Sequence, residues 1–86
     1  MKYAIAFARE AESDLAFLFK ADRGLFRRVL NKIERLADDP RGGKRLVGNH
    51  AGEYSLRVGT YRIVYEIDTE EHIVFILTIK HRKHVY

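Results

Sequence analysis

The segment Glu53-Tyr54-Ser55-Leu56-Arg57-Val58-Gly59-Thr60-Tyr61-Arg62-Ile63-Val64-Tyr65 predicts a β-hairpin around which the rest of the chain can be arranged. Two runs of alternating residues meet at Gly59-Thr60, and glycine in the first of two turn positions is typical of a type II′ turn. A two-residue turn fixes the register of both strands. The predicted pairs are Val58 with Tyr61, Arg57 with Arg62, Leu56 with Ile63, Ser55 with Val64, and Tyr54 with Tyr65.

This register divides the hairpin into two chemically different faces. One face carries the two arginines, Arg57 and Arg62, directly opposite each other, and like charges in this position destabilise a strand pair. A sequence that keeps such a pair favours an anion between them, and phosphate is the first candidate. The other face is apolar and is expected to pack into the core, its tyrosines included. Its residues are Tyr54, Leu56, Val58, Tyr61, Ile63 and Tyr65.

The totals restrict the class of protein. A chain of 86 residues predicts one domain, residues 1–86, and the absence of cysteine excludes disulfides, thiolate metal sites and a thiol nucleophile. The apolar run 3–8 is too short for a signal peptide or a membrane span, so we expect a soluble, cytoplasmic protein. Of the formal charge of +4, residues 41–86 contribute +3, from eight Lys/Arg and five Asp/Glu. This bias favours a polyanionic partner, although an exposed basic face is also often simply solvated.

The periodicity along the chain predicts the order β-α-α-β-β-β. Residues 3–7 alternate as a strand, and a helix begins near Arg9 and ends before Asp22, which is a suitable N-cap for a second helix reaching Ala37. Pro40 ends that helix, and residues 41–45 are expected to form a flexible basic loop. The predicted fold is α+β, with an antiparallel sheet and a two-helix hairpin on one face. We expect residues 3–7 at a sheet edge and the apolar strand 73–80 inside the sheet.

The last strand is expected to extend the basic face. If Ile67 faces Ile73, then Tyr65 faces Phe75 and Tyr61 faces Ile79, which leaves Val74 and Ile76 on the arginine face. If the tail stays extended, this open face also receives basic and titratable residues from the end of the chain. They are Lys80, Arg82, His84 and Tyr86. The two histidines of the tail, His81 and His84, lack the further ligands that a metal site requires.

Several of these motifs resemble the RelE/ParE superfamily of toxins from toxin–antitoxin systems, and its RelE branch in particular. They are Leu46-x-Gly48, Tyr54-Ser55-Leu56-Arg57-Val58, Tyr61-Arg62-Ile63-Val64-Tyr65 and His81-Arg82-x-x-Val85-Tyr86. The resemblance implies a prokaryotic cytoplasmic toxin that cuts mRNA on the ribosome by attack of a 2′-hydroxyl on the adjacent phosphate. It implies no metal or other cofactor, no membrane and no small-molecule substrate, and it implies a cognate antitoxin protein as partner.

The resemblance also implies roles for individual residues. Arg62 would clamp the scissile phosphate, Arg57 would contact the phosphate or the transition state, and Arg82 would match the arginine of the tail motif. Tyr86 would stack on a base or take part in proton transfer. Other residues of this surface are expected to contact RNA: Lys44, Arg45, Ser55, Lys80 and Lys83.

One departure from the family pattern leaves the general base open. Ser55 stands where the best-known members carry a basic residue, and Lys44-Arg45 stands where some relatives carry a glutamate. His81 or His84 can supply a group that titrates near neutrality, and the sequence does not choose between them. Two alternatives therefore remain: a ParE-like inhibitor of DNA gyrase, and an attenuated relative that only binds its antitoxin.

Overall fold

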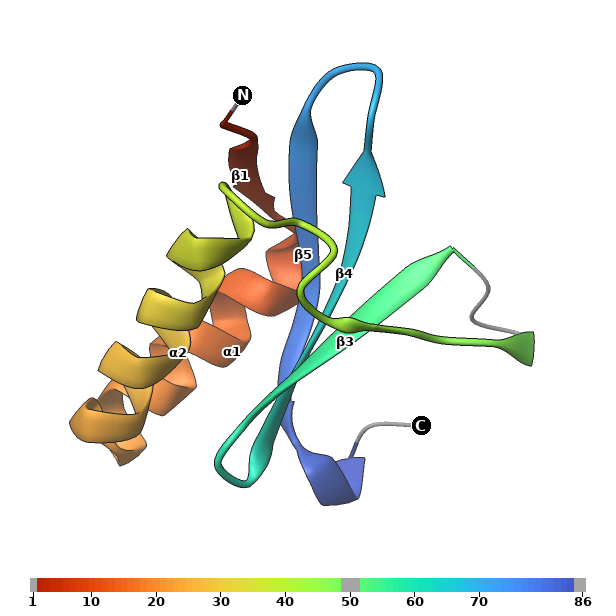
Figure 1. Ribbon diagram of the computed structural model, residues 1–86. Coiled ribbons are helices and arrows are strands. Elements are labelled where there is room, and N and C mark those ends of the chain that lie inside the picture. Colours follow the sequence, from red (N-terminus) through yellow and green to blue (C-terminus); the bar gives the residue numbers. More distant parts are fainter. Residues whose placement is uncertain (1, 49–51, 85–86) are drawn as a thin grey trace.

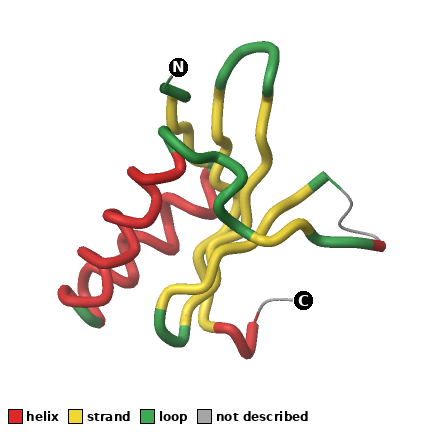
Figure 2. Tube along the Cα trace, in the orientation of Figure 1, coloured by secondary structure: helices red, strands yellow, loops and turns green. Residues whose placement is uncertain are grey.

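The computed structural model describes residues 2–48 and 52–84, in which two helices pack against one face of a twisted sheet (Figure 1). The elements are β1 (Ala4–Phe7), α1 (Arg9–Ala21), α2 (Arg23–Leu36), β2 (Lys44–Arg45), β3 (Glu53–Val58), β4 (Tyr61–Asp68), β5 (Ile73–His81) and the short 3-10 helix η2 (Arg82–His84). α1 contacts β5 and α2 contacts β3, so the helix pair covers one side of the sheet (Figure 2). The α+β class is confirmed.

The helix pair forms where the sequence places it. Asp22 ends α1 and caps α2, and its Oδ1 accepts a hydrogen bond from the Leu25 amide at 3.1 Å, as predicted for an N-cap. The apolar stripe of α2 faces the sheet and buries Val29, Ile33 and Leu36. No helix among residues 2–48 and 52–84 is long and apolar enough to cross a membrane.

The sheet has the strand order β1-β5-β4-β3-β2. β1 lies at an edge and β5 lies inside, as expected, but β1 runs parallel to β5, so the sheet is mixed and the prediction of an antiparallel sheet is wrong for this pair. Parallel neighbours need a long crossover connection. Here that connection includes the helix pair, which carries the chain away from β1 before the meander begins.

The hairpin register is confirmed at every predicted pair, from Val58 with Tyr61 to Tyr54 with Tyr65. Gly59 has a φ of 58°, which a type II′ turn requires in its first central position. The two strands then continue without a register shift, so the turn alone sets which side chains share a face.

The predicted register between β4 and β5 is wrong. Ile63 pairs with Ile79 and Val64 with Thr78, but Tyr65 pairs with Ile76, which leaves Leu77 as an extra residue in β5. Such a bulge reverses the faces of all residues beyond it. Val74 and Ile76 are therefore fully buried on the helix side, against the expectation of an open face, and Phe75 is exposed instead.

The basic loop is also more ordered than predicted. Lys44 and Arg45 form the edge strand β2, in which Lys44 pairs with Ser55 and Arg45 with Tyr54. The buried hydroxyl of Tyr65 holds this segment, because it accepts from the Gly43 amide at 2.9 Å and donates to the Pro40 carbonyl at 2.8 Å. Tyr54 stacks on Tyr65, which agrees with the expected packing role of these rings.

Candidate functional site

The open side of the hairpin carries Arg57 and Arg62 as direct cross-strand neighbours. Arg57 is exposed and Arg62 is half-buried. Within the described ranges, neither guanidinium forms an ion pair or a side-chain hydrogen bond. Like charges on directly paired residues repel each other until an anion neutralises them, and the planar donors of a guanidinium match the oxygens of a phosphate.

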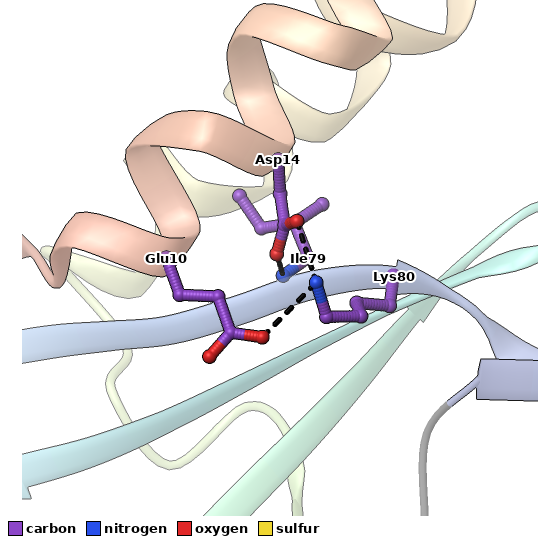
Figure 3. Close-up of polar contacts among 4 residues, drawn as sticks. All are labelled: Glu10, Asp14, Ile79 and Lys80. Carbon is purple, nitrogen blue, oxygen red and sulfur yellow. Dashed lines mark hydrogen bonds and ion pairs between the residues drawn. The ribbon is translucent and has the colours of Figure 1, made fainter.

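Lys80 lies across from Arg62 on β5, but its amine turns toward α1 (Figure 3). Its Nζ donates to Asp14 Oδ1 at 2.7 Å and lies 3.1 Å from Glu10 Oε2. The hydrogen bond to Asp14, supported by Glu10, raises the pKa of Lys80 against the opposing effect of burial. Two carboxylates thus compensate the Lys80 charge, so less of it is directed at a bound anion.

Asp14 also binds the edge of β5. Its Oδ2 accepts from the Ile79 amide at 2.9 Å, at a level of β5 that lies beyond the end of β1. One carboxylate therefore satisfies an unpaired strand amide and holds the lysine that follows it (Figure 3). The sequence pattern did not predict this contact, which joins residues 65 positions apart.

β2 adds a cation to the arginine side of the sheet. Paired residues share a face, and so do residues two apart in a strand, so Lys44, Ser55 and Arg57 lie on the same side. Arg45 pairs with Tyr54 and lies on the opposite side. Of the two basic residues, the structure thus brings only Lys44 to the candidate site.

Residues 82–84 do not stay extended, so the predicted alternation beyond β5 is wrong for them. Arg82 begins η2, and its amide donates to the Thr60 carbonyl at 2.8 Å, which ties the tail to the hairpin turn. Lys83 is exposed, and its amide donates to His81 Nδ1 at 3.3 Å. A 3-10 turn breaks the period of two on which the placement of His84 rested.

The titratable residues of the tail are divided. His81 pairs with Tyr61, with ring centroids 5.8 Å apart, and therefore shares the side opposite Arg62. The backbone of His84 belongs to η2. Tyr86 lies outside the described residues, so its predicted role stays a prediction.

A second group of cations, not predicted from the sequence, lies on α2. Arg28, Lys32 and Arg35 on α2 line a groove of about 340 Å³ together with Arg57 and the hairpin turn. The available signal was their spacing of four and three residues, which places them along one stripe of the helix. Such a stripe is also the ordinary polar face of an amphipathic helix, so the sequence alone does not assign it a function.

Comparison with known proteins agrees with this architecture. A family model described as "ParE toxin of type II toxin-antitoxin system, parDE" matches residues 5–86. Toxin RelG of Mycobacterium tuberculosis is 39% identical over 87 residues, which cover 100% of this chain and 98% of that protein.

Solved structures show the same fold. The toxin–antitoxin complex RelBE2 of Mycobacterium tuberculosis contains a chain that is 36% identical, with a TM-score of 0.84, covering 95% of this chain and 100% of that one. The RelE–RelB complex of the archaeon Pyrococcus horikoshii contains a chain with a TM-score of 0.80 and 24% identity, covering 99% and 100%. The chain therefore belongs to the ParE toxin family of type II toxin–antitoxin systems, within the RelE/ParE superfamily.

Proposed function

We propose that this toxin is an endoribonuclease that cuts mRNA on the ribosome. The observation that carries the proposal is the Arg57–Arg62 pair, whose guanidinium groups have no anionic partner among the described residues and face the side of the sheet that the helices leave open. The similarity to Toxin RelG supports the RelE-like reading of the site.

The proposed reaction needs only the RNA and the side chains of the protein. The 2′-hydroxyl attacks the adjacent phosphorus, the bond from phosphorus to the 5′-oxygen breaks, and a 2′,3′-cyclic phosphate and a 5′-hydroxyl result. Arg62 binds two non-bridging oxygens, and Arg57 and Lys44 stabilise the additional negative charge of the pentacovalent state. We expect Arg82, whose backbone amide is tied to the hairpin turn, to contact the same strand.

Proton transfer is assigned to the tail. A base must take the proton of the 2′-hydroxyl and an acid must protonate the leaving 5′-oxygen. We take His84 and Tyr86 as the first candidates for these roles and His81 as the alternative, because His81 pairs with Tyr61 on the side of the sheet opposite Arg62. Comparison of the cleavage rates of His81→Gln and His84→Gln identifies the base, because loss of the base should lower the rate far more than loss of the other histidine.

An antitoxin is the proposed protein partner. Both the RelBE2 and the archaeal RelE–RelB structures are complexes of a toxin with its antitoxin. Such a partner would add a strand to the sheet edge or lay a helix into a groove, and would displace the tail.

Primer extension on mRNA from cells that express the chain tests the proposed activity. Wild-type protein is expected to produce cuts within translated codons, Arg62→Ala to abolish them and Tyr86→Phe to weaken them. Arg27→Ala is the matched control, since Arg27 lies on α2 beside Ile5 and Phe7, away from the hairpin. Intact translated mRNA in cells whose growth the wild-type toxin arrests would contradict the proposal.

The alternative function is inhibition of DNA gyrase, and one observation favours it: the matching family model is the one described for ParE toxins. Growth arrest with intact mRNA and altered plasmid supercoiling would support this alternative.

Ser55, at a position where the best-known RelE members are basic, is the feature that favours an attenuated toxin, and absence of any toxicity would support that reading.

A further inference from the structure

The groove between α2 and the hairpin turn is lined by four cations and by no acid. Arg28, Lys32 and Arg35 come from α2 and Arg57 comes from β3, while Asn31, Val58 and Gly59 complete the lining. Lys32 is half-buried and the three arginines are exposed. Along residues 2–48 and 52–84, none of these four side chains forms an ion pair. The positive charge of the groove is therefore not compensated within the described part of the protein.

The cations form a row along the helix. With a rise of about 1.5 Å per residue, Arg28, Lys32 and Arg35 are separated by about 6 Å and about 4.5 Å along the axis of α2. The guanidinium of Arg28 lies over the hairpin turn, since its Nη2 is 2.6 Å from where a Cβ on Gly59 would stand. The row therefore begins at the turn and leads away from it.

Arg57 joins this row to the candidate site. It belongs to the lining of the groove and is also the cross-strand neighbour of Arg62. Among the described residues, β2 pairs only with Tyr54 and Ser55, so at Arg57 the strand β3 is the edge of the sheet, where the open face and the groove meet. A strand whose phosphate is bound between Arg57 and Arg62 can thus continue into the groove without crossing an acidic residue of its lining. The series Arg62, Arg57, Arg28, Lys32 and Arg35 forms one basic track.

We infer that this track binds the sugar–phosphate backbone of a single RNA strand, beyond the phosphate that is cut. The inference rests on the proposed function and extends it, because it assigns to α2 a role in affinity and orientation and none in the chemical step. The cations are long, exposed and arranged in a line, which fits successive phosphates and carries no information about base sequence. A small anion would use only one or two members of such a row.

Binding of an uncleavable RNA tests the inference. The ligand is a short single-stranded RNA whose 2′-hydroxyls are methylated, and its affinity for the full chain is measured by fluorescence anisotropy between about 50 and 200 mM salt. The variants are Arg28→Gln, Lys32→Gln, Arg35→Gln and the triple variant. Arg27→Gln is the matched control, with the same helix and the same change of charge but outside the groove.

Each groove substitution is expected to lower the slope of log K against log salt by about 0.7, the value for one phosphate contact to a single strand. The triple variant should lose about three such contacts, while Arg27→Gln should keep the wild-type slope. In a cleavage assay on translating ribosomes, the groove variants should raise KM and leave kcat unchanged.

The inference is overturned if the groove variants bind this RNA with the same slope as Arg27→Gln. It is also overturned if they lose affinity for poly-L-glutamate while RNA binding is unaffected, since the groove would then recognise an acidic polypeptide. Failure of the proposed function is a separate result: the wild-type chain would not cut translated mRNA, whereas the anisotropy slopes would still report on the groove.

Discussion

Lys44 lies directly across from Ser55 on the neighbouring strand, on the same side of the sheet as Arg57. The family resemblance predicts a basic residue at position 55, and this chain has a serine there. Lys44 lies on the edge strand β2, eleven residues before Ser55 in the sequence, and it places a positive charge beside Ser55 on the same side of the sheet. We therefore propose that Lys44 on β2 takes the place of the basic residue expected at position 55.

The first prediction follows from this compensation. Lys44→Gln should lower the rate of RNA cleavage by about tenfold, less than the 10²–10³-fold typical of a buried donor because Lys44 is exposed. Adding Ser55→Lys to that variant should restore most of the rate, since the charge returns to the same side. Arg45→Gln, on the opposite side, serves as the control. Equal losses in the Lys44 and Arg45 variants would contradict the assignment.

The arginine pair should favour activity at the expense of stability. Arg57→Thr removes one of two opposed cations and introduces a strand-forming residue, so the free energy of unfolding should rise by about 0.2–1 kcal/mol. The same substitution should reduce cleavage. Urea unfolding measures the change in stability, and the ribosome assay measures the change in cleavage. Arg45 has no cation opposite it, so the control Arg45→Thr should not gain stability from relieved repulsion. A loss of stability in Arg57→Thr would show that the pair is not strained.

The contact of Tyr65 with Gly43 predicts how β2 is held. Tyr65→Phe leaves the Gly43 amide and the Pro40 carbonyl without their partner, which should cost about 1–3 kcal/mol of unfolding free energy. Gly43→Ala should cost a similar amount, because a Cβ there would stand 2.5 Å from the Tyr65 hydroxyl and 2.7 Å from the Ser55 carbonyl.

Both substitutions should also lower activity, since they loosen the strand that carries Lys44. Gly24→Ala is the opposite control. Gly24 lies in the first turn of α2, and a new Cβ there would stand 3.6 Å from Asp22 Oδ1, which is an ordinary contact distance. The substitution should stabilise the protein by about 0.4–1 kcal/mol. Urea unfolding of the three variants measures these changes. An unchanged unfolding midpoint in Tyr65→Phe would refute the proposed support.

The sequence predicts those features that depend on neighbouring residues. The Gly59-Thr60 turn sets the β3–β4 register, and Asp22 divides the two helices, because both signals act over a few residues. The bulge at Leu77 has no such signal, because it depends on which face of β5 the helices bury. The cations of α2 could be read as a stripe, but their meeting with Arg57 depends on how α2 packs against β3.

The contact of Asp14 with β5 predicts a dependence of stability on pH. The pKa of Lys80 is raised in the folded state, chiefly by the hydrogen bond to Asp14. A raised pKa means that the folded state binds the proton more tightly than the unfolded state. The resulting stabilisation is complete at pH values below the pKa of unfolded Lys80, about 10.4, and is lost as pH rises through the folded pKa. Burial raises the pKa of Tyr65 as well, so wild-type protein has a second contribution of the same sign.

Two substitutions of Asp14 separate its two contacts. Asp14→Asn removes the charge but keeps an oxygen that can accept from the Ile79 amide, whereas Asp14→Ala removes both and should cost about 1–3 kcal/mol near neutral pH. In urea unfolding at about pH 8 and at a pH well above the unfolded pKa of about 10.4, the difference in stability between wild type and Asp14→Asn should shrink at the higher pH. Lys80 has then lost its proton in the unfolded state, so part of the stabilisation that comes from its raised folded pKa is gone. The Tyr65 contribution is common to both and cancels in this difference. Glu12 is an exposed acid in the first turn of the same helix, and the Glu12→Gln control should show no such change. A constant difference between wild type and Asp14→Asn at both pH values would mean that the Lys80 ion pair does not stabilise the fold.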